Sequence, residues 1–169
     1  SSFGETLDGE LAERSAVLFQ RWIPVYHRMI VPLDGSRLAE SILPVVSTFA
    51  AALELEVLLL HVVPEVDRYA YQSTPSRMKA AEDLQGYLKA FGEAMTSQGV
   101  PIGWRVVRGS PVESILKYAA EAPADLIAMS THGMGDNRSA STGSVAAAVL
   151  EKQTRPVLLI KPDQEVADW

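Results

Sequence analysis

Residues 28–63 read RMIVPLDGSRLAESILPVVSTFAAALELEVLLLHVV and predict a strand, a helix and a second strand, in that order. The first apolar run is closed by the turn-forming sequence DGS at 34–36. Apolar residues then recur at intervals of three and four from 36 to 53, which is typical of a helix, and Pro44 is expected to kink it or to cost one backbone hydrogen bond. The run at 55–63 is almost continuously apolar, as a strand buried on both faces requires.

The same alternation of apolar runs and helical segments continues towards the C-terminus. A capping box at Ser110-Pro111-Val112-Glu113 marks one helix start, and Gly99 is a predicted left-handed cap at the end of another helix. The expected later elements are a helix at 74–98, a strand at 104–107, a helix at 110–121, a strand at 125–129, a helix at 144–152 and a strand at 155–160. Strands separated by helices predict an α/β fold with an open five-stranded parallel sheet, doubly wound with helices on both faces.

The composition excludes several classes of protein. The 169 residues are 47% hydrophobic and 21% charged, as in an ordinary globular domain. The chain contains no cysteine, which excludes disulfide scaffolds, thiol catalysis and cysteine-bound metal centres. A net charge of −6 argues against binding to nucleic acid, and no apolar run approaches the roughly 20 residues that span a bilayer. We therefore expect a cytoplasmic protein that binds neither nucleic acid nor membrane.

The alternating pattern divides the chain into three parts. Residues 27–162 contain all of the expected strands and form the predicted domain. Residues 1–26 lie outside the pattern, and the stretch from Gly9 to Trp22 has the spacing of an amphipathic helix. We interpret this N-terminal arm as a segment that packs on the domain or contacts a partner. Residues 163–169 include two Asp and one Glu and are expected to form a solvated acidic tail.

One segment has the composition of an anion-binding loop. In open parallel sheets, ligands bind beyond the carboxyl ends of the strands, where the strand order reverses. The sequence STHGMGDNRSASTGS at 130–144 follows an expected strand, is rich in glycine and hydroxyl groups, and ends at a helix start. Glycine lets backbone amides approach an anion, and a helix N-terminus adds about half a positive charge. Gly143 and Ser144 are therefore candidate phosphate ligands; the alternative is a solvated loop without a ligand.

Two familiar phosphate-binding motifs are excluded. The chain has no Gly-x4-Gly-Lys-Ser/Thr sequence. The GMG sequence at 133–135 lacks the third glycine of the dinucleotide fingerprint, because Arg138 stands at that position. It also follows the fourth expected strand, whereas the fingerprint belongs after the first strand of a strand–helix–strand unit. Another motif must hold any phosphate that binds here.

The glycines of this segment have a recognisable spacing, because Gly133 is followed by nine residues and then by Gly143-Ser144. This resembles the motif Gly-x2-Gly-x9-Gly-Ser/Thr of nucleotide-binding members of the universal stress protein family, with Ser130 at the first glycine position. The resemblance extends over about 27–162 and includes the segments 30–36, 59–62, 109–111 and 156–160. It implies a Rossmann-like fold with the strand order 3-2-1-4-5.

The resemblance also implies a site for an adenine nucleotide, either ATP or its products ADP and AMP. In the family, the aspartate that matches Asp34 lies near the ribose, and the valine that matches Val62 contacts the adenine through its backbone. The residues that match Gly133, Gly143 and Ser144 surround the phosphates. Asp34 is also a candidate ligand for a nucleotide-bound Mg²⁺. The complete predicted site consists of Pro32, Leu33, Asp34, Val62, Ser130, His132, Gly133, Gly143, Ser144 and Val145.

Two histidines lie close to this predicted site. His61, at the end of an apolar strand, is expected to be a hydrogen-bonded core residue. His132 lies inside the glycine-rich segment, where it either orients phosphates or closes the turn. No His-x-x-x-His or similar spacing suggests a metal centre.

Three functions are consistent with these features. The first is a nucleotide-binding stress-response or regulatory protein with unidentified protein partners, which acts as a homodimer; the family implies pairing through the last strand, 156–161. The second is an interaction module of the same fold that binds no nucleotide. The third is a slow ATP-hydrolysing enzyme, which is disfavoured because the segment 130–144 contains neither a lysine nor an evident base. We expect a binding role rather than a catalytic one.

Overall fold

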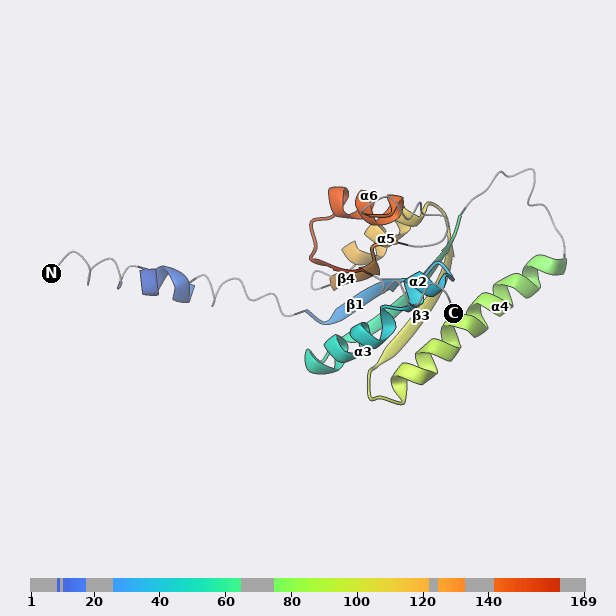
Figure 1. The fold of residues 1–169 in the computed structure, drawn as a ribbon, viewed down its shortest axis with the longest axis horizontal. Coiled ribbons are helices and arrows are strands. Elements are labelled where there is room, and N and C mark those ends of the chain that lie inside the picture. The colour runs from blue at the N-terminus through green and yellow to red at the C-terminus, as the bar shows by residue number, and fades with distance from the viewer. Residues whose placement is uncertain are drawn as a thin grey trace.

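The computed structural model describes most of the domain and a short part of the N-terminal arm (Figure 1). The described residues are 9, 11–17, 26–64, 75–121, 125–132 and 142–161, with the backbone alone at 75–82 and at 125. The acidic tail and the centre of the glycine-rich segment lie outside these residues. Within the arm, residues 11–17 are helical and their side chains are exposed, and the predicted stretch from Gly9 to Trp22 lies partly outside the described residues.

Five parallel strands form one open sheet with the order β3-β2-β1-β4-β5 (Figure 1). The strands are β1 (Arg28–Pro32), β2 (Glu56–Val63), β3 (Ile102–Arg108), β4 (Asp125–Ser130) and β5 (Val157–Ile160). The chain passes from β1 outward to β2 and β3, and then crosses back to place β4 on the other side of β1. The strand order therefore reverses between β1 and β4, which is where ligands bind in sheets of this kind. The predicted fold class and strand order are confirmed.

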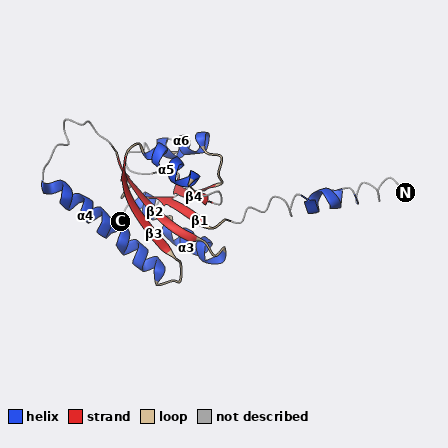
Figure 2. Ribbon diagram, turned by 180° about the vertical axis from the view of Figure 1, so that it is seen from behind, coloured by secondary structure: helices blue, strands red, loops and turns tan. Residues whose placement is uncertain are grey.

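Helices cover both faces of the sheet. In the described part of the domain they are α2 (Arg37–Glu40), α3 (Leu43–Ala52), α4 (Pro75–Thr96), α5 (Pro111–Ala120) and α6 (Ser144–Lys152). Figure 2 shows α3 and α4 on one face and α5 and α6 on the other. Among the described residues, no helix combines the length and the apolar character needed to cross a membrane.

The predicted single helix at 36–53 is instead two helices, α2 and α3. Pro44 lies in the first turn of α3, where its missing N–H removes no helical hydrogen bond. In a continuous helix, the proline ring would collide with the carbonyl group of Glu40, four residues earlier, and Glu40 is the last residue of α2. The proline therefore breaks the helix rather than kinking it.

The other predicted boundaries agree with the structure to within two residues. Gly99 has a φ of +86°, which confirms the predicted left-handed cap after α4. Ser110 occupies the N-cap position of α5 as predicted, but its side chain makes no capping hydrogen bond. The capping-box prediction is therefore right about where the helix begins and wrong about the bond that Ser110 makes.

The core consists of two apolar clusters, one on each face of the sheet. Side chains of β1 alternate between them: Met29 and Val31 belong to the cluster under α3 and α4, and Ile30 to the cluster under α5 and α6. All three are fully buried. The central strand is therefore enclosed on both faces, and only its two ends reach the surface.

Candidate functional site

A tight turn follows the carboxyl end of β1 and presents Asp34. Gly35 has a φ of +86°, a conformation that favours glycine, and turns the chain directly after the aspartate. Asp34 Oδ1 accepts a hydrogen bond from Ser36 N–H at 2.9 Å. The Ser36 hydroxyl in turn accepts from Ala39 N–H at 3.1 Å and so caps α2. The DGS sequence thus fixes the aspartate at the end of the central strand.

The neighbouring strand β2 extends beyond the end of β1. The last backbone bond between the two strands runs from Leu33 N–H to Leu60 C=O (2.9 Å). On its other side, β2 continues to pair with β3 as far as Val63, whose C=O accepts from Gly109 N–H (3.1 Å). Backbone groups of successive residues point alternately to the two sides of a strand. The N–H and C=O of Val62 therefore face the side on which β1 has ended.

His61 closes the end of β1 and separates it from Val62. In a continued parallel ladder, Leu33 C=O would accept Val62 N–H. Instead His61 Nδ1 lies 2.8 Å from Leu33 O, and Nδ1 must carry the proton because a carbonyl oxygen only accepts. The histidine is 8% exposed, which confirms the predicted hydrogen-bonded core residue. Within the described residues, no backbone bond continues the ladder from Val62 towards β1.

Ser130, at the carboxyl end of β4, stands where the family motif has a glycine, and its hydroxyl is hydrogen-bonded to another residue of the protein. Ser130 is buried, and its hydroxyl accepts from His132 N–H at 3.3 Å. Thr131 N–H donates to Ile160 C=O (2.9 Å), and Thr131 Oγ1 lies 2.9 Å from His132 Nδ1. The first two amides after β4 therefore have partners within the protein.

The chain returns to the carboxyl end of β4 directly before α6 begins. Gly143 N–H donates to Thr131 C=O (2.5 Å), and Gly143 is buried at the N-cap of α6. The first bond inside the helix runs from Ala147 N–H to Gly143 C=O (2.9 Å). The amides of Val145 and Ala146 consequently have no partner inside the helix, as is usual in the first turn.

The described members of the predicted site converge on the point where the strand order reverses. The strands β2, β1 and β4 are neighbours in the sheet. Asp34 comes after the end of β1, Val62 lies near the end of β2, and Ser130 ends β4. Gly143 lies beside the end of β4 because it is hydrogen-bonded to Thr131. Gly133 lies outside the described residues. The described residues contain no group of three or more His, Cys, Asp or Glu side chains that could hold a metal ion. Asp34 as a Mg²⁺ ligand therefore stays a prediction.

One neighbour of the site was not predicted from the sequence. The hydroxyl of Tyr87, from α4, donates to Glu40 Oε1 at 2.9 Å. Burial raises the pKa of Tyr87 above its ordinary value, and the hydrogen bond to Glu40 and the negative charges of Glu40 and Asp34 raise the pKa further. Glu40 is the last residue of α2, which follows the turn after β1, so this hydrogen bond places the Tyr87 hydroxyl at the end of α2. Tyr87 and Glu40 are 47 residues apart in the chain, and no local pattern links them.

The fold and the arrangement of these chain segments define a doubly wound α/β protein of the Rossmann-like class. The chain belongs to the universal stress protein family, whose family model matches residues 25–161. The resemblance inferred from the glycine spacing is thereby confirmed.

The chain matches two of its relatives over nearly their whole length. The universal stress protein MJ0577 of Methanocaldococcus jannaschii is 26% identical over 158 residues, which cover 81% of this chain and 96% of the relative. The solved structure of the hypothetical protein MJ0577 matches with a TM-score of 0.73 at 28% identity, covering 83% of this chain and 99% of that chain.

Two more distant structures contain a nucleotide. A universal stress protein in complex with cAMP matches with a TM-score of 0.62 at 21% identity, over 80% of this chain and 97% of that one. The universal stress protein from Archaeoglobus fulgidus in complex with dAMP has a TM-score of 0.60 at 22% identity, over 81% of this chain and 99% of that one. At these identities, both structures support the fold, and their ligands are properties of those proteins.

Proposed function

We propose that this universal stress protein binds an adenine nucleotide at the carboxyl ends of β1, β2 and β4 and acts as a regulatory protein. The observation that best supports the proposal is the backbone edge of Val62, beyond the end of β1. The edge of adenine has an amino donor beside a ring-nitrogen acceptor, which are complementary to the C=O and N–H of one residue. Family members solved with cAMP and dAMP support an adenine nucleotide as the ligand.

With the base at Val62, the ribose would lie towards Asp34 and the phosphates towards α6. A carboxylate accepts hydrogen bonds from ribose hydroxyl groups, as in other doubly wound folds. The first-turn amides and the dipole of α6 attract anions, and Gly143 next to them leaves room for a phosphate. Ser144 and Val145 complete the proposed phosphate side. A Mg²⁺ ion that accompanies the phosphates would be held from the side of Asp34.

We propose a binding role and not rapid turnover of the nucleotide. Phosphoryl transfer requires positive charge at the phosphates and a positioned nucleophile. The segment 130–144 contains one arginine and no lysine, and its carboxylate, Asp136, opposes negative phosphates. Slow hydrolysis is the second candidate activity, and measurable release of phosphate that Gly143→Val abolishes would support it.

Calorimetric titration of the full chain with ATP, ADP, AMP and adenosine tests the proposal. Gly143→Val places a branched side chain at the start of α6, so it should weaken the three nucleotides by about tenfold or more while adenosine still binds. Gly103→Val is the matched control, because Gly103 is exposed in β3 and the nearest atom to a new Cβ is 3.7 Å away. If the unaltered chain binds none of the four ligands, the protein is an interaction module of the same fold.

We further propose that the protein forms a homodimer through β5 and the adjoining residues, 156–161. The edge strand β5 consists of four half-buried apolar residues. Ile160 C=O accepts from Thr131 N–H, so by alternation the N–H and C=O of Leu159 face away from β4 and are suitable for pairing with a second copy. Leu159→Pro removes this outward N–H without removing a bond to β4. Light scattering should show a monomer for Leu159→Pro and a dimer for the control Leu159→Val.

A further inference from the structure

The outer face of α3 lacks the charges that a solvent-exposed helix normally has. The helix reads LPVVSTFAAA, and its inner residues are buried in the core. On its outer side, Phe49 is 43% exposed, and Leu53, the C-cap residue, is 54% exposed. By contrast, α5 has exposed Glu113 and Lys117 on its solvent side. An apolar surface on both sides of a helix is typical of a helix that is covered.

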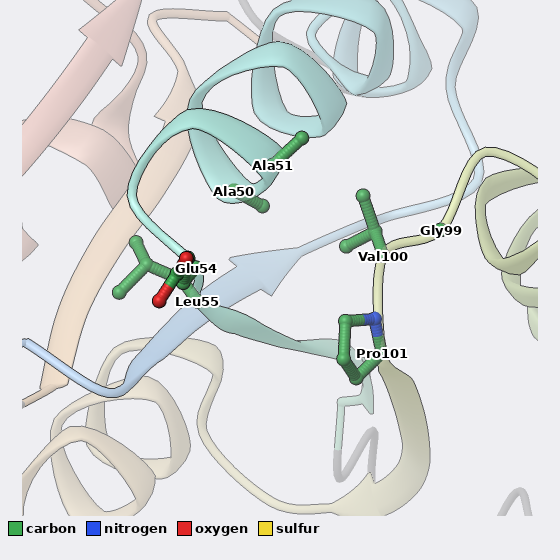
Figure 3. Close-up of a pocket in the computed structure, with 7 residues that line it drawn as sticks. All are labelled: Ala50, Ala51, Glu54, Leu55, Gly99, Val100 and Pro101. Carbon is green, nitrogen blue, oxygen red and sulfur yellow. The ribbon is translucent and has the colours of Figure 1, made fainter.

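A cavity of about 220 Å³ adjoins this apolar surface, and the exposed Glu54 is the one charged residue among the described residues that line it. It lies between the end of α3, at Ala50 and Ala51, and the turn Gly99-Val100-Pro101 that leads into β3 (Figure 3). Phe49, Leu53 and the cavity together form what we call the α3 surface. It lies where the strands begin, at the opposite end of the sheet from Asp34 and Val62.

The N-terminal arm joins the domain beside the α3 surface. His27 C=O accepts from Glu56 N–H (2.9 Å), and Glu56 follows Leu53 by three residues. Tyr26 packs against the same core cluster as the inner side of α3. Figures 1 and 2 both show the end of α3 beside the start of β1. The arm therefore enters the domain next to the uncharged helix.

The sequence of the arm is complementary to this surface. Residues 11–17 are helical. The apolar side chains of Leu11 and Val17 are 58% and 55% exposed, so they face solvent and are not packed in a core. Leu11, Leu18 and Trp22 follow the spacing of one helical stripe. Eight residues, 18–25, separate the described helix from Tyr26, and eight residues span at most about 28 Å. Since α3 has 10 residues and is thus about 15 Å long, the arm can reach all of it.

We propose that the N-terminal arm of the same chain docks on the α3 surface, with its apolar stripe against Phe49 and Leu53. Covalent attachment gives the arm an effective local concentration in the millimolar range, which favours it over a free partner of similar affinity. Docking removes exposed apolar groups of both segments from water. The inference concerns the beginning of the strands and is independent of the nucleotide proposed at their ends.

The lack of cysteine in the chain allows a direct test by disulfide trapping in the full-length protein. Ser15→Cys with Ala52→Cys joins the arm to the α3 surface, because Ser15 lies on the same helical face as Leu11 and Leu18, and both residues are exposed. The matched control pairs Ser15→Cys with Ala120→Cys, an exposed alanine at the end of α5 on the other face of the sheet. Docking brings the first pair within bonding distance far more often, so its intramolecular disulfide should form about tenfold faster or more.

Adding Leu53→Lys to the first pair should remove this acceleration, because the arm would then meet a charge on the α3 surface. Adding Leu53→Met should retain it, and circular dichroism shows whether each variant is folded. Equal rates for the two cysteine pairs would overturn the proposal. Predominantly intermolecular disulfides between residues 15 and 52 would also overturn it, and would identify a second copy of the chain as the occupant.

Discussion

The two ends of the sheet have opposite chemistry although the same strand, β1, connects them. At its carboxyl end, Asp34, Val62 and the start of α6 present backbone and carboxylate groups. At its amino end, Phe49 and Leu53 expose apolar side chains next to the N-terminal arm. One end is therefore suited to a polar small molecule, and the other to an apolar segment of polypeptide.

A rigid core separates these two ends. Met29, Ile30 and Val31 are fully buried, and β1 pairs with strands on both sides. Changes at sites that share no partners are usually additive. We therefore expect substitutions at the carboxyl end to alter nucleotide binding and to leave the trapping of the arm unchanged.

The largest effect is expected for His61→Leu. The substitution removes the donor to Leu33 C=O, which then either loses its partner or takes Val62 N–H and so closes the proposed adenine edge. We expect the free energy of unfolding to fall by about 1–3 kcal/mol and nucleotide affinity to fall about tenfold. Urea unfolding and calorimetry measure the two changes.

His61→Asn is the control, because the asparagine amide can donate from a position close to that of Nδ1. It should retain more affinity than His61→Leu. The rate of disulfide formation between residues 15 and 52 should be the same in both variants. A changed rate would mean that the two ends of the sheet are coupled.

A smaller effect is expected for Ser130→Ala. The serine hydroxyl accepts from His132 N–H, and its removal frees this amide for a phosphate group. One recovered hydrogen bond is equivalent to about a two- to tenfold gain in affinity, and we expect it for ATP more than for AMP. The measurement is the ratio of ATP to AMP affinity by calorimetry. An unchanged ratio would show that His132 N–H does not face the phosphates.

The smallest effect is expected for Tyr87→Phe, which removes the hydrogen bond to Glu40 next to Asp34. We expect the free energy of unfolding at neutral pH to fall by about 0.5–1 kcal/mol. The pKa of Tyr87 is raised above its ordinary 10.0 in the folded protein, so its contribution is present below about pH 10 and is lost as the pH rises further. Stability measured from pH 8 to 11 should fall less steeply for Tyr87→Phe than for the unaltered chain.

The strand order could be anticipated from the family resemblance, and the polar end of the sheet could be anticipated from local signals. The turn at 34–36 and the almost continuous apolar run of β2 indicate buried strands, the first of which ends in a polar turn. The break before Pro44 depended on where Glu40 would fall in the helix, and a pattern of apolar spacing does not contain that information. The sequence therefore predicted the existence of the elements more accurately than the point at which one helix ends.

Contacts between distant residues were the part of the site that could not be anticipated. His61 was predicted as a hydrogen-bonded core residue, but its partner, Leu33 C=O, is 28 positions earlier in the chain. Tyr87 and Glu40 meet only because α4 and α2 lie on the same face of the sheet. Such pairs arise from packing, and the residue types alone do not select the partner.

The hydrogen bond from Gly143 N–H to Thr131 C=O joins the two ends of the connection between β4 and α6. Ala146 and Val149 pack in the core, and this packing holds α6 in position without residues 133–141. Lengthening a closed loop is inexpensive, since each doubling adds only about 0.6 kcal/mol of closure entropy. Positions 134–141 can therefore be varied in a library to test whether they affect the proposed nucleotide binding, and we expect α6 to keep its place.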